Sequence, residues 1–177
     1  MSLLNSTSVH SINATYEWNY SVYLPDQSSS ALPLLLFLHG MGERGSDLEQ
    51  IKKNGPLCRV VKDGEHFPFI IATPQCPAGA WWDSWKLIEL VKHLVSKYQV
   101  DRHRIYLTGV SMGGSGVLKL ASEYPEYFAA VAAVCPFFTP LDPVTLAHTP
   151  TWFFHGAKDE VVPATDSERM VNWIKSV

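Results

Sequence analysis

The sequence predicts a single α/β domain built on a mainly parallel β-sheet. Short apolar runs of strand length alternate with segments of helical periodicity along most of the 177 residues, and this alternation is typical of strand–helix–strand crossovers. The run 34–38 is continuously apolar, as expected for a strand that is covered on both faces. Because 46% of the residues are hydrophobic and no linker interrupts the chain, we expect one core over residues 1–177.

The first 24 residues predict an N-terminal antiparallel hairpin. One short strand is expected at 6–12 and a second at 15–24. Alternation along the second strand places one set of apolar side chains on a single face of the hairpin. That set is Tyr16, Trp18, Tyr20, Val22 and Leu24.

The rest of the chain predicts the parallel strands and the helices that cover both faces of the sheet. Strands are expected at 34–38, 69–72, 104–110, 129–135 and 152–155. Helices are expected from Ser46 to a stop at Asn54-Gly55-Pro56, and at 83–98, 111–122 and 165–174. Capping boxes, in which a Ser or Thr is followed three residues later by Glu, mark the first and the last of these helices.

Charge and cysteine content narrow the functional classes. With 14 basic and 17 acidic residues the net charge is −3, which gives no electrostatic basis for binding nucleic acid or an anionic membrane. No apolar run is long enough to span a membrane, and the first four residues do not resemble a secretory leader. Three cysteines without metal-like spacing favour a reducing compartment and predict no metal site. A cytoplasmic protein is expected, or a secreted one if a leader has been removed.

The motif Gly109-Val110-Ser111-Met112-Gly113 carries the most chemical information. It is a Gly-x-Ser-x-Gly between the strand predicted at 104–110 and the helix predicted at 111–122. A serine on such a sharp strand-to-helix turn exposes its hydroxyl above the sheet, and the glycines avoid collisions with the neighbouring strand. Ser111 is therefore predicted to be the nucleophile of an acyl transfer, with a plain turn as the alternative.

Acyl transfer also needs donors for the oxyanion and an acid that orients the base. The backbone N–H of Met112 is the first predicted donor. The second is expected in the glycine loop after strand 34–38, from the N–H of Met41 or, next, of Gly40; a tight turn without a ligand is the alternative there. Asp159 is predicted to be the acid, because it follows a strand and comes after the nucleophile in the chain.

Alternatives to Asp159 as the acid that orients the base stay open. Glu160 and Asp166 compete with Asp159 on spacing alone, and Asp159 could also be a surface aspartate in a turn beside Lys158. The pattern His-Gly-x-x-Asp-x-Val-Val-Pro at 155–163 favours Asp159.

The chain resembles α/β-hydrolases of the carboxylesterase group, which includes acyl-protein thioesterases, polyhydroxybutyrate-depolymerase-like and feruloyl-esterase-like enzymes, and bacterial predicted peptidases. The resemblance covers the chain from about Leu34 to its end. It rests on segments 36–45, 74–76, 81–82, 109–114 and 155–163. It implies an α/β-hydrolase fold and a serine carboxylesterase that needs no metal or organic cofactor and takes a small-molecule ester.

The resemblance also implies a base histidine well after the acid, and the sequence departs from it here. Eighteen residues follow Asp159, and none is a histidine. The seven histidines all lie upstream: His10, His39, His66, His93, His103, His148 and His155. We expect a chain that lacks the last strand and helix of the fold, and therefore a poor esterase unless a second chain supplies the histidine. The sheet edge left uncovered could support a homodimer.

Three residues are candidates for substrate contact: Trp82, His39 and Glu43. For Trp82 a wall beside the substrate and a place in the core are equally expected, whereas Trp85 is expected in the core. Bracing of a loop is the favoured role for the rings of His39 and His155, and His148 should lie at the opposite rim. Two other functions remain open: a catalytically silent binding module and, less favoured, a peptidase.

Overall fold

The structure is a computed structural model that describes residues 2–6, 9–10, 15–26 and 30–177. Its centre is a seven-stranded sheet with the strand order β1-β4-β6-β5-β7-β8-β9. The strands are β1 (Ser2–Ser6), β4 (Tyr20–Leu24), β5 (Leu32–Leu38), β6 (Ile70–Pro74), β7 (Val100–Val110), β8 (Ala130–Val134) and β9 (Thr151–Phe154). The five strands β5 to β9 pair in parallel, and β1 and β4 are antiparallel to their neighbours. The predicted α/β-hydrolase class, with a mostly parallel sheet, is confirmed.

The N-terminal hairpin is antiparallel as predicted, but its strands are placed differently. The first strand that pairs with β4 is β1, earlier in the chain than the predicted 6–12. The predicted second strand is divided into β3 (Thr15–Tyr16), which pairs with β2 (Val9–His10), and β4. Residues 7–8 and 11–14, and the side chains of His10 and Tyr16, lie outside what the structure describes.

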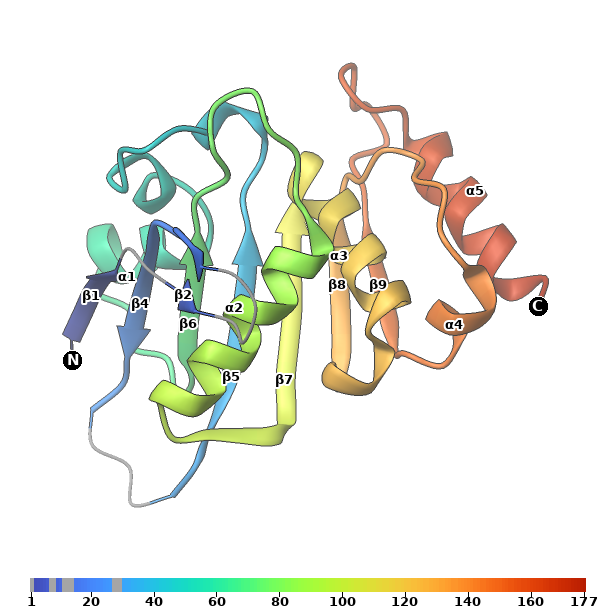
Figure 1. Ribbon diagram of the computed structural model, residues 1–177. Helices are drawn as coiled ribbons and strands as arrows, with labels where there is room; N and C mark the ends of the chain where they lie inside the picture. The colour runs from blue at the N-terminus through green and yellow to red at the C-terminus, as the bar shows by residue number, and fades with distance from the viewer. Residues whose placement is uncertain (1, 7–8, 11–14, 27–29) are drawn as a thin grey trace.

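Helices lie on both faces of the sheet (Figure 1). One face is covered by α2 (Ser84–Lys97), α3 (Met112–Glu123), α4 (Pro143–Ala147) and α5 (Ala164–Lys175), which share a core with the sheet. The other face carries α1 (Gly55–Asp63), whose Leu57 and Val60 pack on Tyr23 and Ile71. None of the described helices is both long and apolar enough to cross a bilayer.

The first predicted helix is wrong, and proline chemistry explains the error. Residues 46–49 form no helix, and only the single 3₁₀ turn Gln50–Lys52 follows them. The segment Asn54-Gly55-Pro56, predicted to end a helix, begins α1 instead. Proline lacks an N–H, and the first turn of a helix needs none, so Pro56 suits a helix start as well as a stop. The helix α4 was not predicted.

The last capping box is also wrong in detail. Helix α5 begins at Ala164 after Pro163, and no side chain caps its N-terminus. The Asp166 carboxylate instead accepts a hydrogen bond from the backbone N–H of Phe138 at 3.0 Å. Asp166 therefore ties α5 to the loop that follows β8.

Candidate active site

Ser111 lies on the sharp turn between β7 and α3. Its φ of 56° and ψ of −118° place a non-glycine residue in a strained region of backbone space. The Ser111 N–H donates to the carbonyl oxygen of Val134 at 2.8 Å, which fixes the turn to β8. A β-carbon on Gly113 would lie 1.9 Å from the carbonyl oxygen of Leu38, and one on Gly109 would lie 2.6 Å from the carbonyl oxygen of Gly113. Only glycine therefore allows β5, β7 and α3 to approach this closely.

The loop after β5 reaches the same turn. The position of a β-carbon on Gly40 is 3.8 Å from Cβ of Ser111, and Gly40, Met41 and Ser111 line one recess of about 560 Å³. Met112 begins α3, where the N–H groups of the first turn have no acceptor within the helix and the helix dipole favours negative charge. The structure thus brings Gly40, Met41 and Met112 to the two sides of Ser111.

His39 braces the loop and does not face open space. The side chain is 1% exposed. Its Nδ1 donates to the carbonyl oxygen of Gly40 at 2.6 Å, and its Nε2 accepts from the backbone N–H of Cys76 at 3.0 Å. Burial lowers the pKa of His39, so the ring is held in its neutral form. A bracing role accounts for all of these contacts, and none of them leaves the ring free for a substrate.

Trp82 and Trp85 differ in burial, and the predicted core position of Trp85 is wrong. Trp82 is buried, its Nε1 donates to the carbonyl oxygen of His39 at 3.2 Å, and its ring stacks on Trp18. One edge of Trp82 still lines a recess beside Met112. Trp85, expected in the core, is 45% exposed because it lies in the first turn of α2 on the solvent side. Trp81 is 59% exposed.

Asp159 lies in the loop after β9, and the loops after β5, β7 and β9 all leave the same edge of the sheet (Figure 1). Its Oδ1 accepts the backbone N–H groups of Val161 and Val162, each at 2.9 Å. These two bonds lower the pKa of Asp159 and keep it ionised. Its Oδ2 lies 3.6 Å from Nε2 of His155 and accepts no hydrogen bond from the described residues. One oxygen therefore fixes the loop, and the other can accept from an imidazole.

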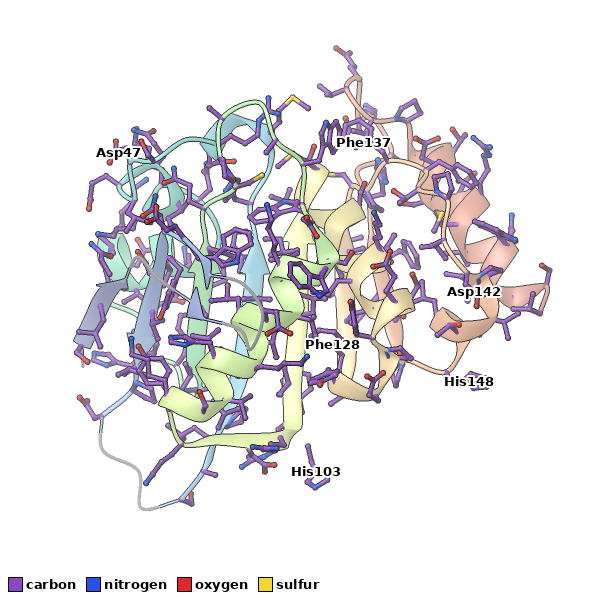
Figure 2. All side chains as sticks on the ribbon, viewed as in Figure 1. Asp47, His103, Phe128, Phe137, Asp142 and His148 are labelled. Atoms are coloured by element: carbon purple, nitrogen blue, oxygen red, sulfur yellow. The ribbon has the colours of Figure 1, made fainter. Side chains whose placement is uncertain are left out.

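Neither of the two described histidines at this edge is a free base. The Nδ1 of His155 bonds to Oγ of Ser167 at 2.7 Å and its Nε2 to the carbonyl oxygen of Val162 at 2.8 Å. His39 is occupied as described above. Figure 2 shows His103 and His148 at the lower edge of the sheet, whereas Phe137, in the loop after β8, lies at the upper edge. The expected position of His148 at the opposite rim is confirmed.

Ser111 lines one recess, and Met112, the next residue, lines a second. The first is lined by Phe37, Gly40, Met41, Gly42, Glu43, Asn54, Gly55, Val110 and Ser111. The second, of about 270 Å³, is mostly apolar and is lined by Trp81, Trp82, Met112, Ser115, Gly116, Lys119, Phe137, Phe138, Thr139 and Pro140. Sequence reasoning had named Glu43 but missed Asn54, because Asn54 was assigned to a helix stop. It also missed the aromatic pair Phe137 and Phe138, which no motif marks.

A second strained residue lies between the two predicted catalytic positions. Ser111 and Cys135 are the non-glycine residues with positive φ in the described part of the chain, and Cys135 has a φ of 38°. Cys135 directly follows β8, the strand between β7 and β9. Its N–H donates to the carbonyl oxygen of Phe154 at 2.7 Å. Backbone strain is therefore concentrated at the edge of the sheet that carries Ser111 and Asp159.

This sheet and its strained serine turn define an α/β-hydrolase fold. The Esterase family model matches residues 11–173, and the chain belongs to that family. Feruloyl esterase B of Neurospora crassa is 28% identical over 126 residues, which are 63% of this chain and 41% of that protein. Acetylxylan esterase A of Aspergillus ficuum is 26% identical over 124 residues, 62% of this chain and 39% of that protein.

The solved structures agree with the fold. The crystal structure of a thermostable esterase superimposes with a TM-score of 0.81 at 28% identity, and the match covers 98% of this chain and 52% of that one. The chain thus spans about half, or less, of the length of the relatives named here.

Proposed function

We propose that this protein is a serine carboxylesterase domain in which Ser111 forms an acyl-enzyme. The observation that supports this most strongly is the strained turn at Ser111, which Met112 follows in the chain and which shares a recess with Met41. The hydroxyl attacks the ester carbonyl, and the two N–H groups stabilise the oxyanion of the tetrahedral intermediate. Asp159, ionised and with Oδ2 available, orients the imidazole of the general base.

We propose that this base is a histidine that is not among the 177 residues. His39 and His155 are the described histidines at the edge of the sheet that carries Ser111 and Asp159. Both ring nitrogens of each are already used in hydrogen bonds that fix neighbouring loops. Losing the histidine of a Ser-His-Asp triad lowers turnover by roughly 10⁴ to 10⁶. The chain by itself should therefore show only the weak activity that the oxyanion hole and substrate binding provide.

The relatives supply the acyl groups to test. They are named feruloyl esterase and acetylxylan esterase, and we propose feruloyl and acetyl esters as substrates of this chain. The apolar recess lined by Trp81, Phe137 and Phe138 could accept an aromatic acyl group.

A fluorophosphonate probe and imidazole rescue test the proposal together. The probe should label the wild-type chain and not Ser111→Ala. Added imidazole should accelerate hydrolysis of p-nitrophenyl acetate by the wild type, and the acceleration should saturate, because free imidazole can occupy the place of the missing base. Ser111→Ala, measured at each imidazole concentration, subtracts the reaction of imidazole with the ester in solution.

A catalytically silent binding module is the second candidate, and the occupied histidines favour it. It predicts equal labelling of the wild type and Ser111→Ala, and no difference between them in imidazole. Asp159→Asn separates the two cases further. A triad acid that orients imidazole should reduce the rescued rate when its charge is removed, whereas a loop aspartate in a silent module has no rate to change.

A further inference from the structure

The recess on the Met41 side of Ser111 contains one charged side chain, that of Glu43. Glu43 ends the 3₁₀ turn Met41–Glu43 after β5. The position of a β-carbon on Gly40 lies 3.5 Å from Oε2 of Glu43 and 3.8 Å from Cβ of Ser111. The carboxylate and the nucleophile therefore both border the same small gap at Gly40.

The two oxygens of Glu43 have different surroundings. Oε1 accepts a hydrogen bond from Nδ2 of Asn54 at 2.6 Å, which fixes the carboxylate. Oε2 has no hydrogen-bond donor among the described residues, and its nearest ring nitrogen, Nδ1 of His39, is 3.8 Å away. That nitrogen already donates to the carbonyl oxygen of Gly40. Glu43 lines the recess, and Oε2 is an acceptor that no described donor uses.

The charge of Glu43 is not neutralised by its surroundings. Only 17% of its side chain is exposed. His39 is neutral, because burial lowers its pKa. Arg44, the neighbouring cation, donates to the carbonyl oxygens of Met41 and Ala80. Across the part of the chain that the structure describes, no lysine or arginine forms an ion pair with Glu43. The recess is thus negative and rich in acceptors.

We propose that Glu43 is a specificity-determining residue that accepts a hydrogen bond from a hydroxyl on the alcohol arm of the ester. A hydroxyl is neutral and can donate to Oε2, and a neighbouring hydroxyl can reach the amide of Asn54. An anionic alcohol arm meets the carboxylate as a like charge and is rejected. In the same proposal the acyl arm occupies the apolar recess that Met112 lines. This inference rests on the proposed nucleophile but concerns which ester is chosen.

Three acetate esters with alcohol arms of three carbons test the inference: propyl acetate, 2,3-dihydroxypropyl acetate and 3-acetoxypropanoate. With rescue by imidazole, the wild type should prefer the dihydroxypropyl ester to propyl acetate by about tenfold or more in kcat/KM. It should use the anionic ester least of the three. Glu43→Gln should reduce the preference for the hydroxyls and raise the relative rate on the anionic ester. The matched control is Glu49→Gln, which changes an exposed carboxylate paired with Lys52 and should leave both ratios unchanged.

A binding experiment gives the answer without turnover. Titration of the Ser111→Ala chain with each ester, followed by ligand NMR, should rank the three dissociation constants in the same order, and Glu43→Gln in that background should flatten the ranking. Equal dissociation constants for propyl and dihydroxypropyl acetate would overturn the role of Glu43 even if Ser111 is the nucleophile. Tighter binding of the anionic ester would do the same.

Loss of phosphonate labelling in Glu43→Gln, with the fold intact by urea unfolding, would also overturn the inference, because it would place Glu43 in the reaction itself. If instead the wild type and Ser111→Ala label equally, the proposed function fails while the binding order can still be measured. The two failures are therefore distinguishable.

Discussion

Two loops of this protein begin with the same dipeptide and use it differently. His39-Gly40 follows β5, and His155-Gly156 follows β9. Both imidazoles are mostly buried, and each has one ring nitrogen on a carbonyl oxygen of the loop that follows, Gly40 for His39 and Val162 for His155. The other ring nitrogen bonds a different element: the N–H of Cys76 after β6 for His39, and Oγ of Ser167 in α5 for His155. The glycines differ: the β-carbon position of Gly40 lies within 4 Å of Glu43, Val110 and Ser111, whereas no atom of the described residues lies within 4 Å of that position on Gly156.

The loops after β5 and β9 are held in place by different kinds of contact. The loop after β5 is packed against the nucleophile turn, and Met41, Glu43 and Ser111 line the same recess. The loop after β9 is closed on itself by Oδ1 of Asp159, which accepts two N–H groups of the same loop. The first loop is positioned by contacts with other elements, and the second mostly by its own hydrogen bonds. Substitutions should therefore affect the two loops unequally.

Gly113→Ala should have the largest effect. Its β-carbon would lie 1.9 Å from the carbonyl oxygen of Leu38 and 2.7 Å from that of His39, both backbone atoms of β5 and its loop. Backbone atoms cannot rotate away, so we expect a loss of more than about 4 kcal/mol or no folded protein. Urea unfolding and soluble yield measure this. Gly156→Ala is the control, and its free energy of unfolding should stay within about 0.5 kcal/mol of the wild type. A Gly113→Ala protein as stable as the wild type would show that α3 and β5 pack less closely at this point.

Replacing the two histidines should give the next largest effects. His39→Leu removes the acceptor of the buried Cys76 N–H and the donor to Gly40, so it should cost about 2–4 kcal/mol. His155→Leu removes the hydrogen-bond partner of Ser167 and of the Val162 carbonyl oxygen. Because these two bonds are less buried than those of His39, the free energy of unfolding should fall by only about 1–2 kcal/mol. Urea midpoints at pH 8 give both values. The reverse order would mean that the loop after β9 is the more dependent on its ring.

Gly40→Ala should separate activity from stability. The new methyl would meet Glu43 and Ser111 at 3.5–3.8 Å, which are ordinary contacts, so the fold should tolerate it. The methyl would nevertheless occupy the gap between the carboxylate and the nucleophile, and we expect the imidazole-rescued rate to fall about tenfold. Gly156→Ala should change neither quantity. A rate for Gly40→Ala equal to that of the wild type would remove this gap from the substrate path.

The smallest effect expected is a change in the pH dependence of stability. His39 has a folded-state pKa below its ordinary value of 6.5, so on acidification the unfolded chain binds a proton before the folded chain does. Stability should therefore be complete above pH 6.5 and decrease as the pH falls below it, by at most about 1.4 kcal/mol per pH unit. His39→Leu should lose this part of the slope. Urea unfolding of both proteins between pH 7.5 and pH 5 measures it, and parallel curves would contradict the assignment to His39.

Patterns within single segments could be read from the sequence. The continuous apolar run became β5, and the stripe of apolar residues at helical spacing became α2, which Asp83 caps through its side chain. The helix stop at Asn54-Gly55-Pro56 failed because those three residues suit a helix start equally well. Trp85 was misplaced because periodicity cannot show which side of a first helical turn faces solvent.

The sequence by itself determined the nucleophile turn, because a serine with glycines two positions before and after it, between a strand and a helix, is the local pattern of such a turn. It also determined that Asp159 follows a strand at the carboxyl edge of a parallel sheet. Only the tertiary structure decided that His39 and His155 are occupied braces, that Asn54 fixes Glu43 beside Ser111, and that Cys135 shares the backbone strain. The physical reason is that hydrogen-bond partners and approaches between loops depend on how strands distant in sequence pair, and no local pattern records that pairing.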